Sequence, residues 1–380
     1  TLKELVISAL ETHEAVEIAD SEIRRASADK KLARSAIMPR LNLGGTYTYY
    51  GKDASIELSP GEEFVIRPAQ DWSWNADLRQ TLFYGLRPWR AKNIAKLNYD
   101  IAQLDKQTTI NDLTLDVAAS FLSARAAKEG VQVRKVALEQ IEGQLKVATR
   151  RYDVGESTIA DVARWQSEVA AAKQAYIVAK GDATFALHSL ARLTGVEKIE
   201  SLETLGPVPI PPGGADTLID QAYEDRWEMK TLANQLEAAG LWIKLEKGAW
   251  LPELEASAMY YQQKAAFPAS GWASLVLNLK VPIYDGGVTS ANVAKAKEDL
   301  RQVQLLDQTL RRNIADQVDN AFIGYEAADA ALDAARERTK AAREAYRQVE
   351  AAFRVGEASS VDLLDATTEA VEAETSHIIA

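Results

Sequence analysis

Two long stretches of the sequence contain no proline and are predicted to form single helices. The first begins at Pro88 and runs to Arg150 without a further proline. Apolar residues such as Ile94, Leu97 and Ile101 recur in it at spacings of three and four. The second covers residues 289–354 and repeats this pattern. About sixty helical residues span roughly 90 Å. Helices of this length exceed those of globular domains and imply coiled-coil packing.

Before each long helix, two short segments alternate apolar and polar residues, as half-apolar strands do. Each strand has about ten residues, which is the length that crosses a bilayer when a strand is tilted. The connection within the first pair is long, and the connection within the second pair is short. The four segments are residues 41–49, 72–79, 254–260 and 273–281.

The chain is a duplication of one unit. Residues 151–156, RYDVGE, parallel residues 352–357, AFRVGE, and an aspartate follows each glycine by six positions, at Asp161 and Asp362. Each half has the order helix, strand pair and long helical hairpin. We therefore expect a first repeat over 1–195, a proline-rich linker over 196–215 and a second repeat over 216–380. By analogy with the first repeat, the last helix is expected to be cut short at the final residue of the sequence.

Charge and composition exclude several classes of function. The net charge of −11 argues against a nucleic-acid partner. The sequence has no cysteine, and its three histidines lie far apart. It shows no nucleophile–base pair, phosphate loop or metal-ligand spacing, so we expect no enzyme, no cofactor and no metal site. The first residues do not resemble a signal peptide, which leaves either earlier removal of one or a cytoplasmic protein.

Four strands cannot close a sheet by themselves. An open sheet in lipid would leave the N–H and C=O groups of its edges unpaired, at a cost of several kcal/mol each. If the strands cross a membrane, other copies of the chain must complete the sheet. This argument predicts an oligomer without fixing the number of copies.

Several segments of this chain resemble those of one known family. They are the proline entries into strands at Pro39 and Pro252, the strand-to-helix segments 82–85 and 282–287, the two Val-Gly turns and the segment VDLLDATT at 361–368. In their order and duplication they resemble the TolC family of outer-membrane efflux proteins. The resemblance implies a mainly α fold with a small β part. Duplicated helical hairpins would form a trimeric α-barrel, and four strands per protomer would contribute to a shared twelve-stranded transmembrane β-barrel.

The resemblance also implies a function and partners. The chain would be the outer-membrane channel or exit duct of a tripartite efflux or type I secretion system, with its helical tunnel in the periplasm. It would form a homotrimer in outer-membrane lipid and meet a periplasmic adaptor protein, while an inner-membrane pump delivers the substrates. The alternative is a periplasmic adaptor or coiled-coil scaffold without channel activity. An adaptor needs one helical hairpin, whereas this chain has two. The resemblance does not identify the exported substrate.

The resemblance assigns the gate and the docking surface to the hairpin turns. Asp362 and Asp365, three residues apart on one helix face, would line the pore and form rings of carboxylates. Phe353 and Ala358 stand where the family has a tyrosine and an arginine that latch the gate. A structural alternative for Asp362 is a helix cap with Ser359 or Ser360. The residues expected at the tip and against the adaptor are Val154, Gly155, Glu156, Asp161, Phe353, Val355, Gly356 and Glu357.

Overall fold

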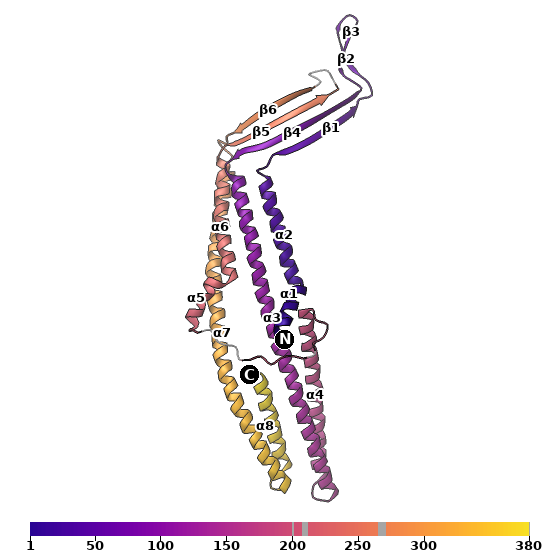
Figure 1. Ribbon diagram of the computed structural model, residues 1–380, viewed down its shortest axis with the longest axis vertical. Coiled ribbons are helices and arrows are strands. Elements are labelled where there is room, and N and C mark those ends of the chain that lie inside the picture. Colours follow the sequence, from indigo (N-terminus) through magenta and orange to yellow (C-terminus); the bar gives the residue numbers. More distant parts are fainter. Residues whose placement is uncertain (200, 207–211, 265–270, 380) are drawn as a thin grey trace. The chain divides into compact units, whose positions relative to one another are not determined.

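The computed structural model describes residues 1–199, 201–206, 212–264 and 271–379, and part of the predicted linker, residues 207–211, lies outside them. In Figure 1 each half has two helices, a strand pair, a long helix and a further helix, and the first half adds β2 and β3 between its paired strands. The helices are α1 Leu2–Thr12, α2 Glu14–Ser35, α3 Arg87–Asp153, α4 Ile159–Thr194, α5 Ala215–Asp225, α6 Trp227–Lys247, α7 Val288–Val355 and α8 Ser360–Ile379. The strands are β1 Arg40–Tyr49, β2 Ala54–Ser59, β3 Glu62–Arg67, β4 Gln70–Tyr84, β5 Glu253–Gln263 and β6 Gly271–Lys280.

The two long helices are continuous, with 67 residues in α3 and 68 in α7. The helix expected at the start of the chain is two helices, because His13 has an extended backbone with φ −77° and ψ 132°. The second half repeats this break at Arg226, with φ −63° and ψ 134°. Apolar periodicity continues through such a break, so the sequence pattern does not reveal it.

Four strands form one antiparallel sheet in the order β1-β4-β5-β6. The pairs β1–β4 and β5–β6 are the two predicted strand pairs, and the β4–β5 ladder joins one half of the chain to the other. Many of the apolar side chains are exposed, including Leu43 at 77% and Leu275 at 75%. Strands β1 and β6 are the edges of the sheet within the chain.

The long connection between β1 and β4 contains a second, two-stranded sheet of β2 and β3. The sequence pattern predicts only a long connection here, without strands. Strand β3 reads EEFVIR and does not alternate apolar with polar residues, so the period-two signal of a strand is missing there.

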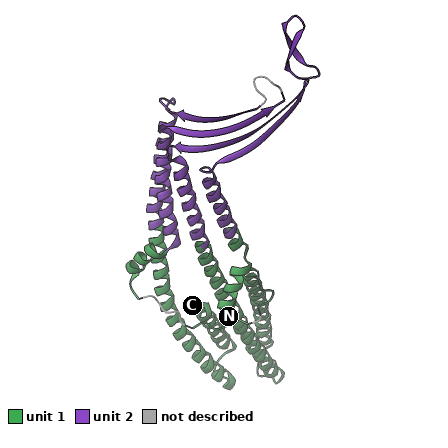
Figure 2. Cartoon of the chain, turned by 45° about the horizontal axis from the view of Figure 1, so that its top comes forward, with its two compact units in different colours: residues 1–18, 107–225, 312–380 green, residues 19–106, 226–311 purple. Residues whose placement is uncertain are grey.

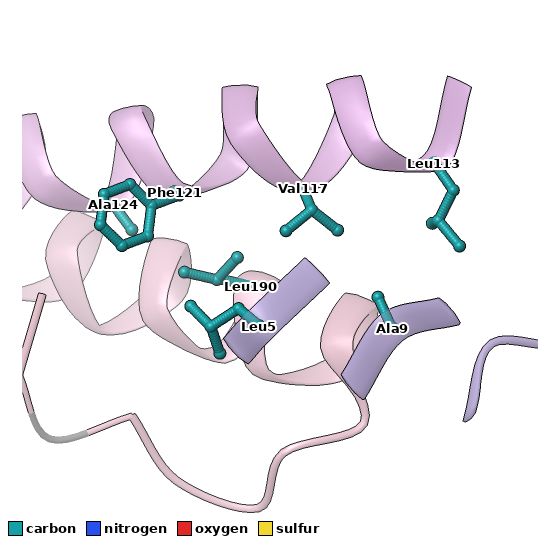
Figure 3. Packing of buried hydrophobic residues seen from close by; sticks show 7 residues of the cluster. All are labelled: Leu5, Ala9, Leu113, Val117, Phe121, Ala124 and Leu190. Carbon is teal, nitrogen blue, oxygen red and sulfur yellow. The ribbon is translucent and has the colours of Figure 1, made fainter. Parts of the chain in front are cut away.

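The chain divides into two compact units, coloured in Figure 2. The first comprises residues 1–18, 107–225 and 312–380, and the second comprises residues 19–106 and 226–311. In the first unit, α1 packs against α3 and α4, and Leu5 and Ala9 lie in one cluster with Phe121 and Leu190 (Figure 3). All four side chains are buried, and this cluster is a hydrophobic core of the unit.

The second unit holds the four-stranded sheet and the helix segments joined to it. Lys106 of α3 forms an ion pair with Asp20 of α2 at 2.7 Å. Asp105, also in α3, accepts a hydrogen bond of 3.1 Å from the Thr231 hydroxyl of α6. At the end of β4, Arg90 donates to the carbonyl oxygen of Gly85. These polar contacts hold α2 and α6 against α3 below the sheet.

Candidate functional site

The turn between α3 and α4 is built around Gly155. Its φ of +80° lies in the left-handed region, which glycine adopts without a steric penalty. The Glu156 N–H donates to the Arg151 carbonyl at 2.8 Å, and the Gly155 N–H donates to the Tyr152 carbonyl at 2.9 Å. This pair of bonds is a Schellman motif, which satisfies the last carbonyls of a helix. The side chain of Val154 is 70% exposed at the tip of the turn.

The turn between α7 and α8 has the same construction. Gly356 has a φ of +86°. The Glu357 N–H donates to the Ala352 carbonyl at 2.9 Å, and the Gly356 N–H donates to the Phe353 carbonyl at 3.2 Å. Val355 is 72% exposed. The two repeats therefore present two nearly identical Val-Gly-Glu turns, both in the first unit.

An aspartate caps the helix that follows each turn. Thr158 and Asp161 form a capping box at the start of α4, in which each side chain bonds the backbone N–H of the other. Ser359 and Asp362 form the same pair of bonds at the start of α8, at 3.2 and 2.9 Å. The structural alternative for Asp362 that the sequence suggested is thus present in the fold.

These caps lower the pKa of both carboxyl groups. Hydrogen bonds from the Ser359 hydroxyl and then from its backbone N–H hold the pKa of Asp362 below its ordinary value. The Thr158 hydroxyl and backbone N–H do the same for the pKa of Asp161. In one copy of the chain, each capping aspartate is therefore held in its charged form.

A hydrophobic core joins the two turns. Trp165 of α4 is 1% exposed and packs with Phe353 of α7 and Leu363 of α8. The Trp165 indole Nε1 is buried and has no hydrogen-bond partner among the described residues. Phe353, expected at the tip surface, lies inside this core, and Ala358 packs against it.

Arg151 links the first turn to the second by polar contacts. Its guanidinium donates to the carbonyl oxygens of Phe353, at 3.0 Å, and Arg354, at 3.2 Å. The same group lies 4.7 Å from the centre of the Phe353 ring, within range of a cation–π interaction. Sequence reasoning missed this residue. Its only sequence signal is a basic residue in the last turn of a helix, which is common.

One face of α8 carries a row of carboxylates, spaced by three and four residues. Asp362 and Asp365 lie at the turn end of this row, and both are exposed. Further along, Arg338 of α7 forms ion pairs with Glu369 at 2.8 Å and with Glu372 at 3.7 Å. No described cation lies within ion-pair distance of Asp365. Uncompensated negative charge is thus concentrated at the turn end of the row.

The described residues contain no group of three or more histidine, aspartate or glutamate side chains placed to hold a metal ion. Among the helices in the described ranges, none is both long and apolar enough to cross a membrane.

Comparison with known proteins identifies the group to which this fold belongs. The family model described as outer membrane efflux protein matches residues 5–196 and 218–380. The chain is 23% identical to outer membrane protein TolC of Escherichia coli, over 94% of this chain and 76% of the relative. It is 25% identical to outer membrane efflux protein BepC of Brucella suis, over 98% and 80%. The solved structure of outer membrane protein VceC from Vibrio cholerae covers 100% of this chain and is itself covered to 92%, with a TM-score of 0.84 and 14% identity.

These matches confirm the predicted fold class, a mainly helical protomer with a small β part, of the kind that forms trimeric channels with an α-barrel and a β-barrel. The relatives are channel proteins and not enzymes. They support the predicted efflux channel and not the alternative of a periplasmic adaptor or scaffold. The chain belongs to the outer membrane efflux protein family, and it is an efflux channel of the outer membrane with its helical tunnel in the periplasm.

Proposed function

We propose that this channel is the passive exit duct of a tripartite export system, in which a periplasmic adaptor protein holds the hairpin turns and an inner-membrane pump supplies the energy. The observation that carries this proposal is the pair of matching Val-Gly-Glu turns. Both turns expose a valine and a glutamate, and both follow a long helix of the tunnel. A repeated, exposed and rigid motif suits recognition by a repeated partner.

The docking surface consists of the exposed residues of the two turns, Val154, Gly155, Glu156, Val355, Gly356 and Glu357. The other two tip residues support it from within. Asp161 fixes the start of α4 through its cap, and Phe353 fills the core beneath the second turn. An apolar residue flanked by an acidic one favours an adaptor surface with a small apolar pocket beside a basic residue.

We further propose that Asp362 and Asp365 form the gate. Both are exposed on one face of α8, and neither is neutralised by an ion pair with a described residue. Two carboxylates per copy and three copies place six carboxylates around one constriction. Crowded like charges bind cations, so multivalent cations on the periplasmic side should block conduction.

Arg151 serves as the latch of this gate. The family latch is expected at the positions of Phe353 and Ala358, neither of which has a polar side chain. Here the bonds run from the Arg151 guanidinium to the backbone of the second turn. They hold the end of α7 against the end of α3, so the second turn cannot move outward without breaking them.

Single-channel recording of the purified trimer in a planar bilayer tests the duct. Wild type is expected to conduct weakly, and variants with an opened gate are expected to conduct strongly. A complete lack of conductance in both the wild type and the gate variants would contradict the proposal.

A further inference from the structure

The β2–β3 hairpin is firmly rooted at the ends of β1 and β4. The Tyr50 N–H donates to the Ala69 carbonyl at 2.8 Å, which extends the β1–β4 ladder by one pair. The Arg67 guanidinium lies 4.2 Å from the centre of the Tyr50 ring. Figures 1 and 2 show the hairpin standing clear of the four-stranded sheet. Its position is therefore set by the sheet, although the body of the hairpin touches little else.

The hairpin has one apolar face and one acidic face. Ile56 lies directly opposite Phe64, and Glu57 lies directly opposite Glu63. Residues that are opposite each other in an antiparallel pair share a face. On the acidic face the Ser55 hydroxyl donates to Glu63 at 2.6 Å. Leu58 and Ile66, each two positions from a member of the apolar pair, lie at the two register shifts of the hairpin and flank the pair. Val65, opposite Ser55, lies on the acidic face.

The apolar face is uncovered in a single copy of the chain. Ile56 is 46% exposed and Leu58 is 65% exposed, and Phe64 and Ile66 are exposed as well. A two-stranded hairpin alone is marginally stable in water, and opposed carboxylates weaken it further. Clustered apolar side chains of this kind mark a contact surface. The hairpin thus needs a partner to cover it.

The sheet indicates which partner this is. Strand β1 is an edge of the sheet, and in the trimeric fold that edge continues into the next copy. The strands join α2 and α3 at their other end, so the hairpin lies at the mouth that faces away from the periplasm. Three-fold symmetry places three hairpins equivalently around that mouth. The acidic face disfavours an anionic lipid surface, whereas packing the apolar faces together leaves the carboxylates in water.

We propose that the three β2–β3 hairpins of the trimer pack on one another through Ile56, Leu58, Phe64 and Ile66 and cover the outer mouth of the channel. The proposal rests on the trimeric channel fold and not on the identity of the adaptor, the pump or the cargo. It adds a second closure to the proposed aspartate gate.

Single cysteines test this packing, because the chain has none of its own. Ile56→Cys and Phe64→Cys probe the apolar face, and Glu57→Cys is the matched control on the acidic face. A short bis-maleimide is expected to link two copies through the apolar-face cysteines and to leave Glu57→Cys unlinked. A membrane-impermeant maleimide added to intact cells should label Ile56→Cys about tenfold more slowly than Glu57→Cys, because a buried thiol reacts only when its surroundings open.

Equal labelling on both faces without linked copies would overturn the proposal, since the hairpins would then stand apart in water. Slow labelling without linked copies, or linkage to another protein, would overturn it too, because the partner would not be a second copy. In a second arm, measured in the Arg151→Ala background so that the proposed aspartate gate does not limit conduction, Ile56→Asp with Phe64→Asp should raise the conductance of a trimer that stays intact on a native gel. Unchanged conductance in that variant would show that the mouth is not covered. The linkage and labelling results do not depend on export, so they stand whether or not the proposed function holds.

Discussion

The guanidinium of Arg151, at the end of α3, lies 4.7 Å from the centre of the Phe353 ring at the end of α7 and donates to the Phe353 carbonyl at 3.0 Å. One side chain of the first repeat thus contacts both the ring and the backbone of Phe353 in the second repeat. Since the two residues are 202 positions apart in the sequence, this contact ties together the ends of two helical hairpins that also share an apolar core.

Arg151→Ala should loosen the tip and open the gate. The loss of two hydrogen bonds from a charged donor and of a partly exposed cation–π contact should cost about 1–2 kcal/mol. Single-channel recording should show a higher open probability than in wild type. Arg150→Ala is the matched control, because Arg150 is exposed and its side chain bonds no described residue. Equal open probability in the two variants would exclude Arg151 as the latch.

Removing the two gate aspartates should weaken the block by cations. Asp362→Ala combined with Asp365→Ala should raise the concentration of a multivalent cation needed for half-block from the periplasmic side, because fixed negative charge is removed from the constriction. Asp365→Asn removes one of the two gate charges and leaves the helix cap intact. It should therefore produce part of this effect. Asp161→Ala controls for the loss of a cap without loss of a gate charge. If block is unchanged in the double variant, these aspartates do not form the gate.

Adaptor docking can be tested at the exposed valines. A photo-reactive amino acid at Val355 should form a crosslink in cells to a protein that mass spectrometry identifies as a periplasmic adaptor. The same substitution at Val136, an exposed valine of α3 away from the turns, should not. Crosslinking of equal yield at both positions would argue against a docking site at the turns.

Much of this arrangement follows from the sequence because it depends on local chemistry. The absence of proline and the apolar spacing specify α3 and α7. The Val-Gly pairs specify left-handed turns, and serine three residues before aspartate specifies the cap of α8. The Arg151 contact has no such signal, since the reach of a guanidinium to a distant carbonyl depends on how two repeats pack. The β2–β3 hairpin is missed for a different reason, because β3 reads EEFVIR and lacks the alternation that marks a strand.

Replacing a glycine of either turn should destabilise the chain, whereas replacing a glycine inside a helix should not. Gly155→Ala and Gly356→Ala should each cost about 1–2 kcal/mol, because alanine is strained at a positive φ even though neither added Cβ meets an atom within 4 Å. Gly143→Ala is the matched control inside α3, where the added Cβ also meets nothing within 4 Å. It should stabilise the chain by up to about 1 kcal/mol. Chemical denaturation would contradict the assignment if all three variants shifted in the same direction.

Low pH should destabilise the two hairpin turns, because it protonates the aspartates of the two helix caps. The pKa values of Asp161 and Asp362 are lowered in the folded chain, so their contribution to stability is present above the ordinary carboxyl pKa of 3.8 and is lost as the pH falls below it. Asp362→Asn should therefore lower the thermal midpoint at pH 7 and lower it by less at pH 3, where part of this contribution is lost. A midpoint difference between wild type and variant that is the same at both pH values would contradict this linkage.

Trp165 offers a test of the core that joins the two turns. The buried Nε1 has no partner among the described residues, and an unsatisfied buried donor costs about 1–3 kcal/mol. Trp165→Phe removes that donor along with some volume, so its net effect on unfolding should stay within about 1 kcal/mol. Trp165→Ala should instead cost about 3–5 kcal/mol, because it leaves a cavity beside Phe353 and Leu363. Trp89→Ala, at a tryptophan that is 54% exposed, is the control for losing an indole without losing a core. If Trp165→Phe were as destabilising as Trp165→Ala, the indole N–H would have to make a hydrogen bond in the folded chain, and this account of the core would be wrong.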